Sequence, residues 1–129
     1  MPNKLSTVIR TDNVQNLITR AGANARVKLY NGAQHASLGT PPGTLLATLI
    51  AGTVLGTATN GAIDWDEANF TQTNSSHVAG TPTYMRIETS AGVACAEYIF
   101  GAGGYTLSGA VATGQNVTLT ALTTTAGDV

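Results

Sequence analysis

The sequence predicts a mainly β protein: a jelly-roll-like β-sandwich with one N-terminal α-helix. The first observation is composition, because the 129 residues include 21 Thr and 15 Gly while charged residues make up only 10%, and threonine favours strands and can face water through its hydroxyl. The second is a series of about seven short apolar runs, separated by turn residues and without βαβ alternation. Such a series is typical of two packed sheets, and a jelly roll is one common way to connect their strands.

The length of the chain favours one domain over residues 1–129, with an N-terminal arm and helix over 1–22 and the β-sandwich over 25–124. The first ten residues lack the apolar core of a signal peptide, and no apolar run approaches the ~20 residues needed to span a bilayer. We therefore expect synthesis in the cytoplasm and no membrane partner. The net charge of −1 provides no basic face for nucleic acid.

Charged residues are scarce for a free monomer. About a quarter of the residues of a typical globular chain are charged, and such charges normally keep a surface soluble. We therefore expect part of the surface to be covered by other protein, either in a homo-oligomer or on a larger body.

A helix is expected over residues 6–20, with Ser6 or Thr7 as the N-cap and Gly22 ending it. Two apolar residues near its start fall outside the apolar stripe, so a start near Thr11 is an alternative. The stripe follows the i, i+3, i+4 spacing of one helix face and consists of Val14, Leu17 and Ile18.

The next elements are two strands and two irregular stretches. RVKLY at 26–30 alternates as a half-buried strand does and ends at the turn pair Asn31-Gly32. The stretch 34–43 has no periodicity and predicts an exposed loop long enough for a contact role. TLLATLIAG at 44–52 is a nearly continuous apolar run, so it predicts a strand that is buried on both faces or carries a bulge. Residues 53–61 are rich in turn formers.

The clearest element is a β-hairpin over residues 83–100, in which Met85 and Ile87 alternate with polar residues and Gly92 can take the positive φ of a short turn. Strict alternation predicts that Met85 and Ile87 lie in the core and that the intervening side chains face water. The chain before the hairpin, 71–82, predicts a polar loop, and QNVTLTALTTT at 115–125 predicts a final strand. The side chains expected in water are Tyr84, Arg86 and Glu88.

Three carboxylates surround the only tryptophan, Trp65, and are the best candidate for a cation site or for acid–base chemistry. Clustered oxygen ligands suit calcium, but the spacing lacks a calcium-loop pattern, and in a strand the third carboxylate would point away from the first two. A solvated acidic turn is the favoured interpretation. The carboxylates are Asp64, Asp66 and Glu67.

No motif predicts catalysis, a cofactor or a metal. His35 and His77 with Cys95 could in principle form a nucleophile–base pair or a zinc site, but their spacing matches neither. We expect two loop histidines without a ligand role and a cysteine that acts as a small buried hydrophobe. Aromatic residues are sparse for a sugar-binding platform, which could only be built from Trp65, Tyr84, Tyr98 and Tyr105.

The order of the segments resembles a group of small tailed-bacteriophage virion proteins encoded near the capsid genes. The segments span Leu5 to Leu122 and are LSTVIRTDNVQNLITR, VKLYNG, GTLLATL, TATNGAI, GTPTYMRIETSAG and QNVTLTAL. By analogy with phage cement proteins of similar size, the resemblance implies a capsid decoration protein without enzymatic activity. It also implies a jelly-roll-like sandwich, often trimeric, seated on the outer capsid surface against the major capsid protein. The stretch DWDEANFTQTNSSH is longer and more acidic than this resemblance leads us to expect.

Irregular segments can become ordered against a partner, so the arm and the loop are the expected capsid contacts. Two other functions stay open: a tail- or fibre-associated β-module, and a carbohydrate-binding module. The expected contact residues are Met1, Pro2, Asn3, Lys4 and Leu5 of the arm, and Gln34, His35, Leu38, Pro41 and Pro42 of the loop.

Overall fold

The computed structural model describes residues 6–33, 39, 41, 43–100, 110–117 and 123–125. It is mainly β with one helix at the N-terminus, as the sequence predicts. The elements in chain order are α1 (Thr7–Ala21), β1 (Arg26–Tyr30), β2 (Leu45–Ile50), β3 (Gly56–Thr59), β4 (Ala62–Trp65), the 3₁₀ turn η1 (Glu67–Asn69), β5 (Thr71–Gln72), the 3₁₀ turn η2 (Asn74–Ser76), β6 (Tyr84–Glu88), β7 (Ala94–Ile99) and β8 (Thr123–Thr125).

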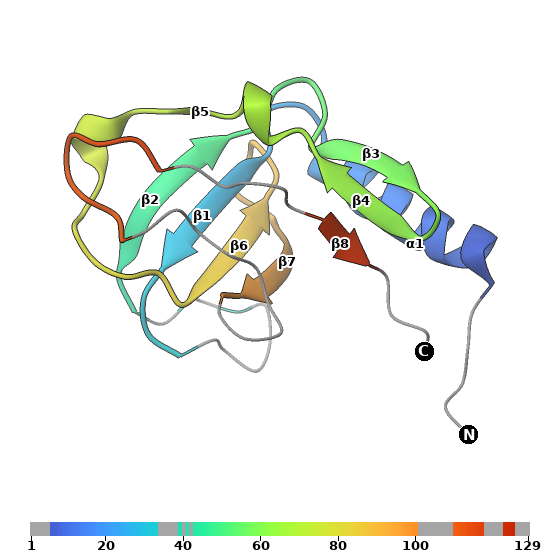
Figure 1. The fold of residues 1–129 in the computed structure, drawn as a ribbon, viewed down its shortest axis with the longest axis horizontal. Helices are drawn as coiled ribbons and strands as arrows, with labels where there is room; N and C mark the ends of the chain where they lie inside the picture. The colour runs from blue at the N-terminus through green and yellow to red at the C-terminus, as the bar shows by residue number, and fades with distance from the viewer. Residues whose placement is uncertain are drawn as a thin grey trace.

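The strands form two antiparallel sheets. The larger has the order β5-β2-β1-β6-β7 and the smaller has the order β3-β4-β8. Helix α1 packs against β3 and β4 of the smaller sheet and also contacts β7 of the larger one (Figure 1). The arrangement is compatible with a β-sandwich, and the jelly-roll connection stays a prediction.

Helix α1 begins where its N-cap places it. The Ser6 hydroxyl accepts a hydrogen bond from the Ile9 amide at 3.3 Å, which satisfies one of the free N–H groups of the first turn. Gly22 ends the helix with φ 71°, and its own amide donates to the carbonyl of Ile18 at 3.1 Å. The alternative start near Thr11 is therefore wrong. The stripe that faces the core consists of Val14, Ile18 and Ala21, with Leu17 at its edge.

Strand β2 contains the bulge that its sequence allows. Leu29 of β1 lies opposite Ala47 and Tyr30 lies opposite Leu45, so Leu46 is the extra residue in the ladder. The bulge turns Leu46 into the core, where 1% of it is exposed, while Leu45 stays 37% exposed. The alternative in which this run is buried on both faces is wrong at its ends.

The turn-rich stretch 53–61 contains a strand that the sequence did not predict. Strand β3 pairs with β4 through a two-residue turn in which Asn60 and Gly61 have φ 51° and 80°, and two consecutive positive φ values fit the right-handed twist of a hairpin. Gly56 lies so close to β4 that a side chain there would collide with the Asp64 carbonyl. Strand β3 was missed because GTAT has no large apolar side chain.

The stretch 71–82, expected to be a loop without pattern, is partly ordered as well. Strand β5 pairs with the end of β2, Gln72 opposite Leu49, and the chain then leaves through η2. It returns to β2 where the Val78 amide donates to the Leu46 carbonyl at 2.8 Å. A two-residue strand is too short to produce a visible alternation in the sequence.

The β6–β7 hairpin is confirmed, but one expectation about it is wrong. Gly92 has φ 87° in the turn, and Met85 and Ile87 are fully buried. The residues expected in water are buried too, because that face of the sheet is covered as well. Their exposed fractions are 0% for Tyr84, 6% for Arg86 and 5% for Glu88.

The core is one cluster to which α1, the small sheet and the large sheet all contribute, and it includes Trp65 and Ile63 of β4 together with Val27 and Ile87 of the large sheet. Strand β8 confirms the end of the expected 115–125 strand and pairs with β4, whereas residues 118–122 lie outside the described residues. No helix in the described part of the chain has the length and hydropathy to cross a bilayer.

Truncation of Ile87 to alanine should lower the free energy of unfolding by about 2–5 kcal/mol, because this side chain of β6 is fully buried in the core. Val78→Ala is the control, since Val78 is 47% exposed, and it should change stability by no more than about 0.5 kcal/mol. Urea unfolding followed by circular dichroism measures both. Equal losses in the two variants would contradict this core assignment.

Candidate functional site

Most of the predicted contact residues lie outside the part of the chain that the structure describes. This holds for Met1, Pro2, Asn3, Lys4 and Leu5 of the arm and for Gln34, His35, Leu38 and Pro42 of the loop. Pro41 is described and is half-buried. The site that can be built from contacts is therefore the sheet face to which this loop is attached.

The two ends of the loop are joined at the end of the β1–β2 ladder. The Asn31 amide donates to the Thr44 carbonyl at 3.1 Å, and the Thr44 amide donates to Asn31 Oδ1 at 2.6 Å. Gly43 has φ 85° and passes so close to the Asn31 carbonyl that any side chain would collide with it. The Thr83 hydroxyl adds a hydrogen bond to the Gly32 carbonyl. The base of the loop is thus fixed to β1, β2 and the start of β6.

A network of four charged side chains lies on the adjoining face of the large sheet. Arg86 is central: its Nη1 lies 2.9 Å from Glu97 Oε2 and its Nε lies 3.1 Å from Glu88 Oε2. Lys28 Nζ lies 2.8 Å from Glu88 Oε1. Arg86 Nη1 also donates to the Gly39 carbonyl at 2.6 Å, which ties the described part of the loop to the sheet.

The strand register creates this network. Arg86 of β6 lies between Lys28 of β1 and Glu97 of β7 in the ladder, so all three side chains share one face. The exposed fractions of the side chains are 8% for Arg86 and 2% for Glu97. Buried charges are costly unless they are paired, and each of these has an ion-pair partner of opposite sign. Sequence reasoning missed the network because it assigned this face to water, although the charges of opposite sign on neighbouring strands were the available signal.

Two tyrosines extend the same face toward the loop. Tyr30 and Tyr84 lie opposite each other on β1 and β6, and their rings stack with centroids 5.3 Å apart. Burial raises the pKa of both phenols above the usual value, and the Glu88 carboxylate near Tyr30 and the Glu97 carboxylate near Tyr84 raise it further. Both rings therefore stay neutral over an extended range of pH.

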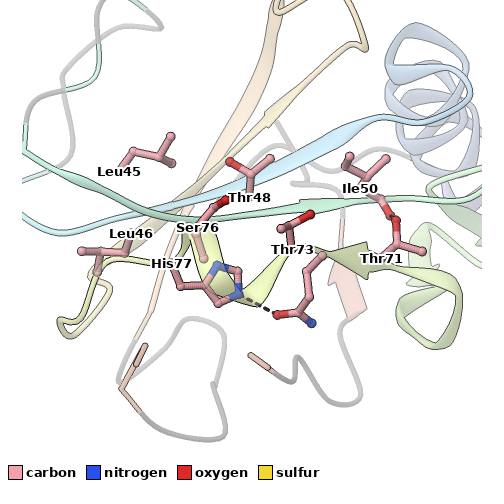
Figure 2. A pocket seen from close by; sticks show the side chains of 10 residues that line it. Leu45, Leu46, Thr48, Ile50, Thr71, Thr73, Ser76 and His77 are labelled. Carbon is pink, nitrogen blue, oxygen red and sulfur yellow. Dashed lines mark hydrogen bonds between the residues drawn. The ribbon is translucent and has the colours of Figure 1, made fainter. Parts of the chain in front are cut away.

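A groove of about 410 Å³ lies on the outer side of β2, between this strand and the stretch from β5 to His77 (Figure 2). Its lining has no charged side chain and mixes aliphatic groups of β2 with the hydroxyls of Thr48, Thr73 and Ser76. His77, expected to be a loop residue without a ligand role, is 4% exposed and bonds Gln72 at 2.8 Å.

The Gln72 amide determines that Nε2 of the His77 ring carries a proton. Gln72 Nε2 donates to the Val117 carbonyl at 2.9 Å and Gln72 Oε1 accepts from the Val117 amide at 2.7 Å. Because an amide oxygen can only accept, the His77 Nε2 that contacts it carries the proton. His77 therefore has a structural partner in the sheet border.

Two carboxylates of the acidic cluster are described, Asp64 and Asp66. Asp64 is an exposed residue of β4, and Asp66 Oδ2 accepts from Asn69 Nδ2 at 2.8 Å, which closes the turn η1. Among the described side chains, no group of three or more His, Cys, Asp or Glu could hold a metal ion. The expected acidic turn is thus the end of a strand followed by a 3₁₀ turn.

Cys95 lies in a second bulge, at the start of β7, and borders a cavity of about 510 Å³ between α1 and the hairpin turn. It is half-buried and packs against the core, as expected for a small hydrophobe. Burial raises the pKa of its thiol, an effect that the nearby Arg20 partly opposes. A raised pKa leaves little thiolate at neutral pH, so the thiol is a poor nucleophile.

Three of the four aromatic residues named for a sugar platform are described, and their rings pack inside the protein. Trp65 is 2% exposed and Tyr84 is fully buried. Tyr98 packs edge-on against Trp65 with ring centroids 5.9 Å apart, and Tyr105 lies outside the described residues. The described aromatic rings serve packing.

No protein-family model, curated protein or solved structure matches this chain. Function must therefore be argued from the residues and their arrangement.

Arg86→Leu should lower the free energy of unfolding by about 3–5 kcal/mol, because it leaves two buried carboxylates without their shared cation. The double variant R86L/E97L should recover part of this loss, since it removes the uncompensated charge of Glu97. Chemical unfolding of both variants measures the difference. A double variant that is less stable than R86L would show that the Glu97 carboxylate does not depend on Arg86.

Absorbance titration at 295 nm should show two tyrosines that ionise above the usual pKa of about 10. Because the folded pKa is raised, the stabilising contribution is complete below the unfolded pKa and is lost as pH rises through the folded pKa. Stability should therefore fall above about pH 10. Tyr30→Phe and Tyr84→Phe should each remove one of the two phenols with a raised pKa from the titration. A titration that is unchanged in either variant would show that the replaced tyrosine is not one of them.

Proposed function

We propose that this chain is a bacteriophage virion structural protein, specifically a capsid decoration protein that binds the outer capsid surface and stabilises contacts between major capsid subunits. One observation carries the proposal. The sequence has 13 charged side chains, and four of them form the internal ion-pair network: Lys28, Arg86, Glu88 and Glu97. The surface of the protein is thus poorer in charge than its composition suggests, and such a surface suits contact with other protein.

Exposed apolar side chains support the same proposal. They occur on α1, along β2, in the hairpin turn and in the connections after β2 and η2, so they offer contacts at several places on the molecule. The most exposed are Val8 at 70%, Val93 at 61%, Ile9 at 48%, Val78 at 47%, Val54 at 44%, and Leu45 and Ile50 at 37%.

The role proposed here is non-enzymatic and needs no cofactor, nucleic acid or membrane. The partner is the major capsid protein, and further copies of the chain are a second partner, in the homotrimer that the family resemblance implies. Each copy would contribute a modest binding free energy to the shell, and many symmetric copies together would oppose the outward pressure of packaged DNA. The chain would be made in the host cytoplasm and would end up on the capsid surface.

The loop between β1 and β2 is attached to the large sheet, which suits it for contact with the capsid. Arg86 and Asn31 hold the described parts of the loop on a rigid sheet face, and a loop held by a rigid scaffold loses less conformational entropy when it binds. This consideration favours the loop over the termini as the main contact, with the arm before Ser6 as the second.

The experiment compares phage particles with the gene intact and with the gene deleted. Mass spectrometry of purified virions should find the protein, gold-labelled antibody should place it on the head, and the deleted particles should lose DNA at a lower temperature. Added protein should restore the stability. Label confined to the tail would favour the tail or fibre module, and absence from virions would refute the proposal.

Deletion of Met1 to Leu5 should weaken binding to decoration-free particles by at least about tenfold. The deletion keeps Ser6, so the helix N-cap and the fold should persist. The matched control replaces the five residues with a Gly/Ser segment of equal length and should bind as weakly as the deletion. Unchanged occupancy in a co-sedimentation assay would exclude the arm as a contact.

A further inference from the structure

Helix α1 has an exposed side that the hairpin turn flanks. Its buried stripe faces the sheets, and the exposed side carries Asp12, Asn16 and Arg20, of which Asn16 and Arg20 also border the cavity beside the hairpin turn. These residues follow one another at intervals of four, so they form a line along the helix. Asp12 and Arg20 are about 12 Å apart along the axis, since each residue advances the helix by 1.5 Å. In Figure 1 the helix lies at the outside of the molecule, behind β3 and β4.

The two charges on this line have no ion-pair partner in the described part of the chain. The sequence has only 13 charged residues, and the ion-pair network around Arg86 includes neither Asp12 nor Arg20. Asp12 and Arg20 thus stand at the two ends of a polar face with an uncharged residue at its centre. A face of this kind is electrostatically complementary to its own copy, rotated by 180°.

A two-fold axis that passes beside Asn16 would bring the opposite charges of two copies together. Two antiparallel α1 helices that meet with Asn16 against Asn16 place Asp12 opposite Arg20 of the second copy, and Arg20 opposite its Asp12. Both ion pairs form at once because a two-fold interface repeats each contact. Antiparallel helices pack at axis separations of about 8–10 Å, which the long arginine side chain can bridge.

The same rotation covers apolar surface that the monomer exposes. Ile9, which is 48% exposed, comes opposite Ala23 just beyond the end of the second helix, and the more exposed Val8 comes opposite Asn24. Val93 of the hairpin turn is 61% exposed and borders the cavity beside Asn16 and Arg20, at the flank of the contact. The charged pairs would set the alignment of the helices while these side chains supply apolar area.

We propose that the exposed face of α1 is a homodimer interface in which two antiparallel helices are held in register by reciprocal Asp12–Arg20 pairs. This inference is independent of the proposed capsid role. A two-fold contact joins subunits in pairs, whereas the homotrimer implied by the family resemblance needs a different surface. On a particle, such a contact would link neighbouring copies across a local two-fold axis.

The test exploits the reciprocity of the contact. Asp12→Arg places two arginines opposite each other in its own homodimer, and Arg20→Asp places two aspartates opposite each other. Each variant alone should dimerise at least about tenfold more weakly than the parent. An equimolar mixture of the two should recover dimerisation, because every pair is again of opposite charge. Sedimentation velocity over a concentration series measures the affinities, and native mass spectrometry identifies the mixed dimer.

Asp64→Arg is the matched control, because Asp64 is exposed on the face of β4 that points away from buried Ile63 and Trp65. It should dimerise like the parent, and circular dichroism should be unchanged in all variants. A parent that stays monomeric, single reversals that dimerise normally, or a mixture that fails to form the mixed dimer would each overturn the proposal. These outcomes are separate from virion occupancy, so either proposal can fail alone.

Discussion

The ion-pair network around Arg86 is the constraint on which the rest of the structure depends. It joins three adjacent strands on one face, takes four of the few charges of the chain out of solvent, and holds the described part of the loop through the Gly39 carbonyl. A buried cation with two carboxylates has few alternative arrangements of equal energy, so it also fixes strand register. The same network explains why so little charge remains to keep the outer surface in water.

The sequence was most informative where one local rule acted alone. The N-cap and the left-handed Gly22 bound α1, and the lost alternation at Leu45-Leu46 indicated a bulge that the ladder contains. Prediction from the sequence failed where packing between distant segments determines the local structure. Strand β3 has no large apolar residue and exists because Gly56 allows close contact with β4, and the outer face of β6 is buried because other parts of the chain cover it.

The candidate site was less predictable than the fold for the same reason. Arg86, Glu88 and Glu97 were visible as charges, but only the ladder shows that they meet. His77 was expected in a loop, yet it is bonded to Gln72, which is in turn held by Val117, 45 residues after Gln72 along the chain. Contacts that depend on chain reversals over such distances leave no periodic trace in a sequence.

The Gln72 amide has a further consequence. By presenting both a donor and an acceptor to the main chain of Val117, it imitates one more peptide unit at the border of β5, while the reciprocal bonds between Gly80 and Val111 close the neighbouring stretch. These bonds occupy main-chain groups of Val117, Gly80 and Val111, so fewer groups at this border are left to pair with a foreign strand. A Thr-rich chain that accumulates to high local concentration would otherwise risk polymerising into fibrils from that side.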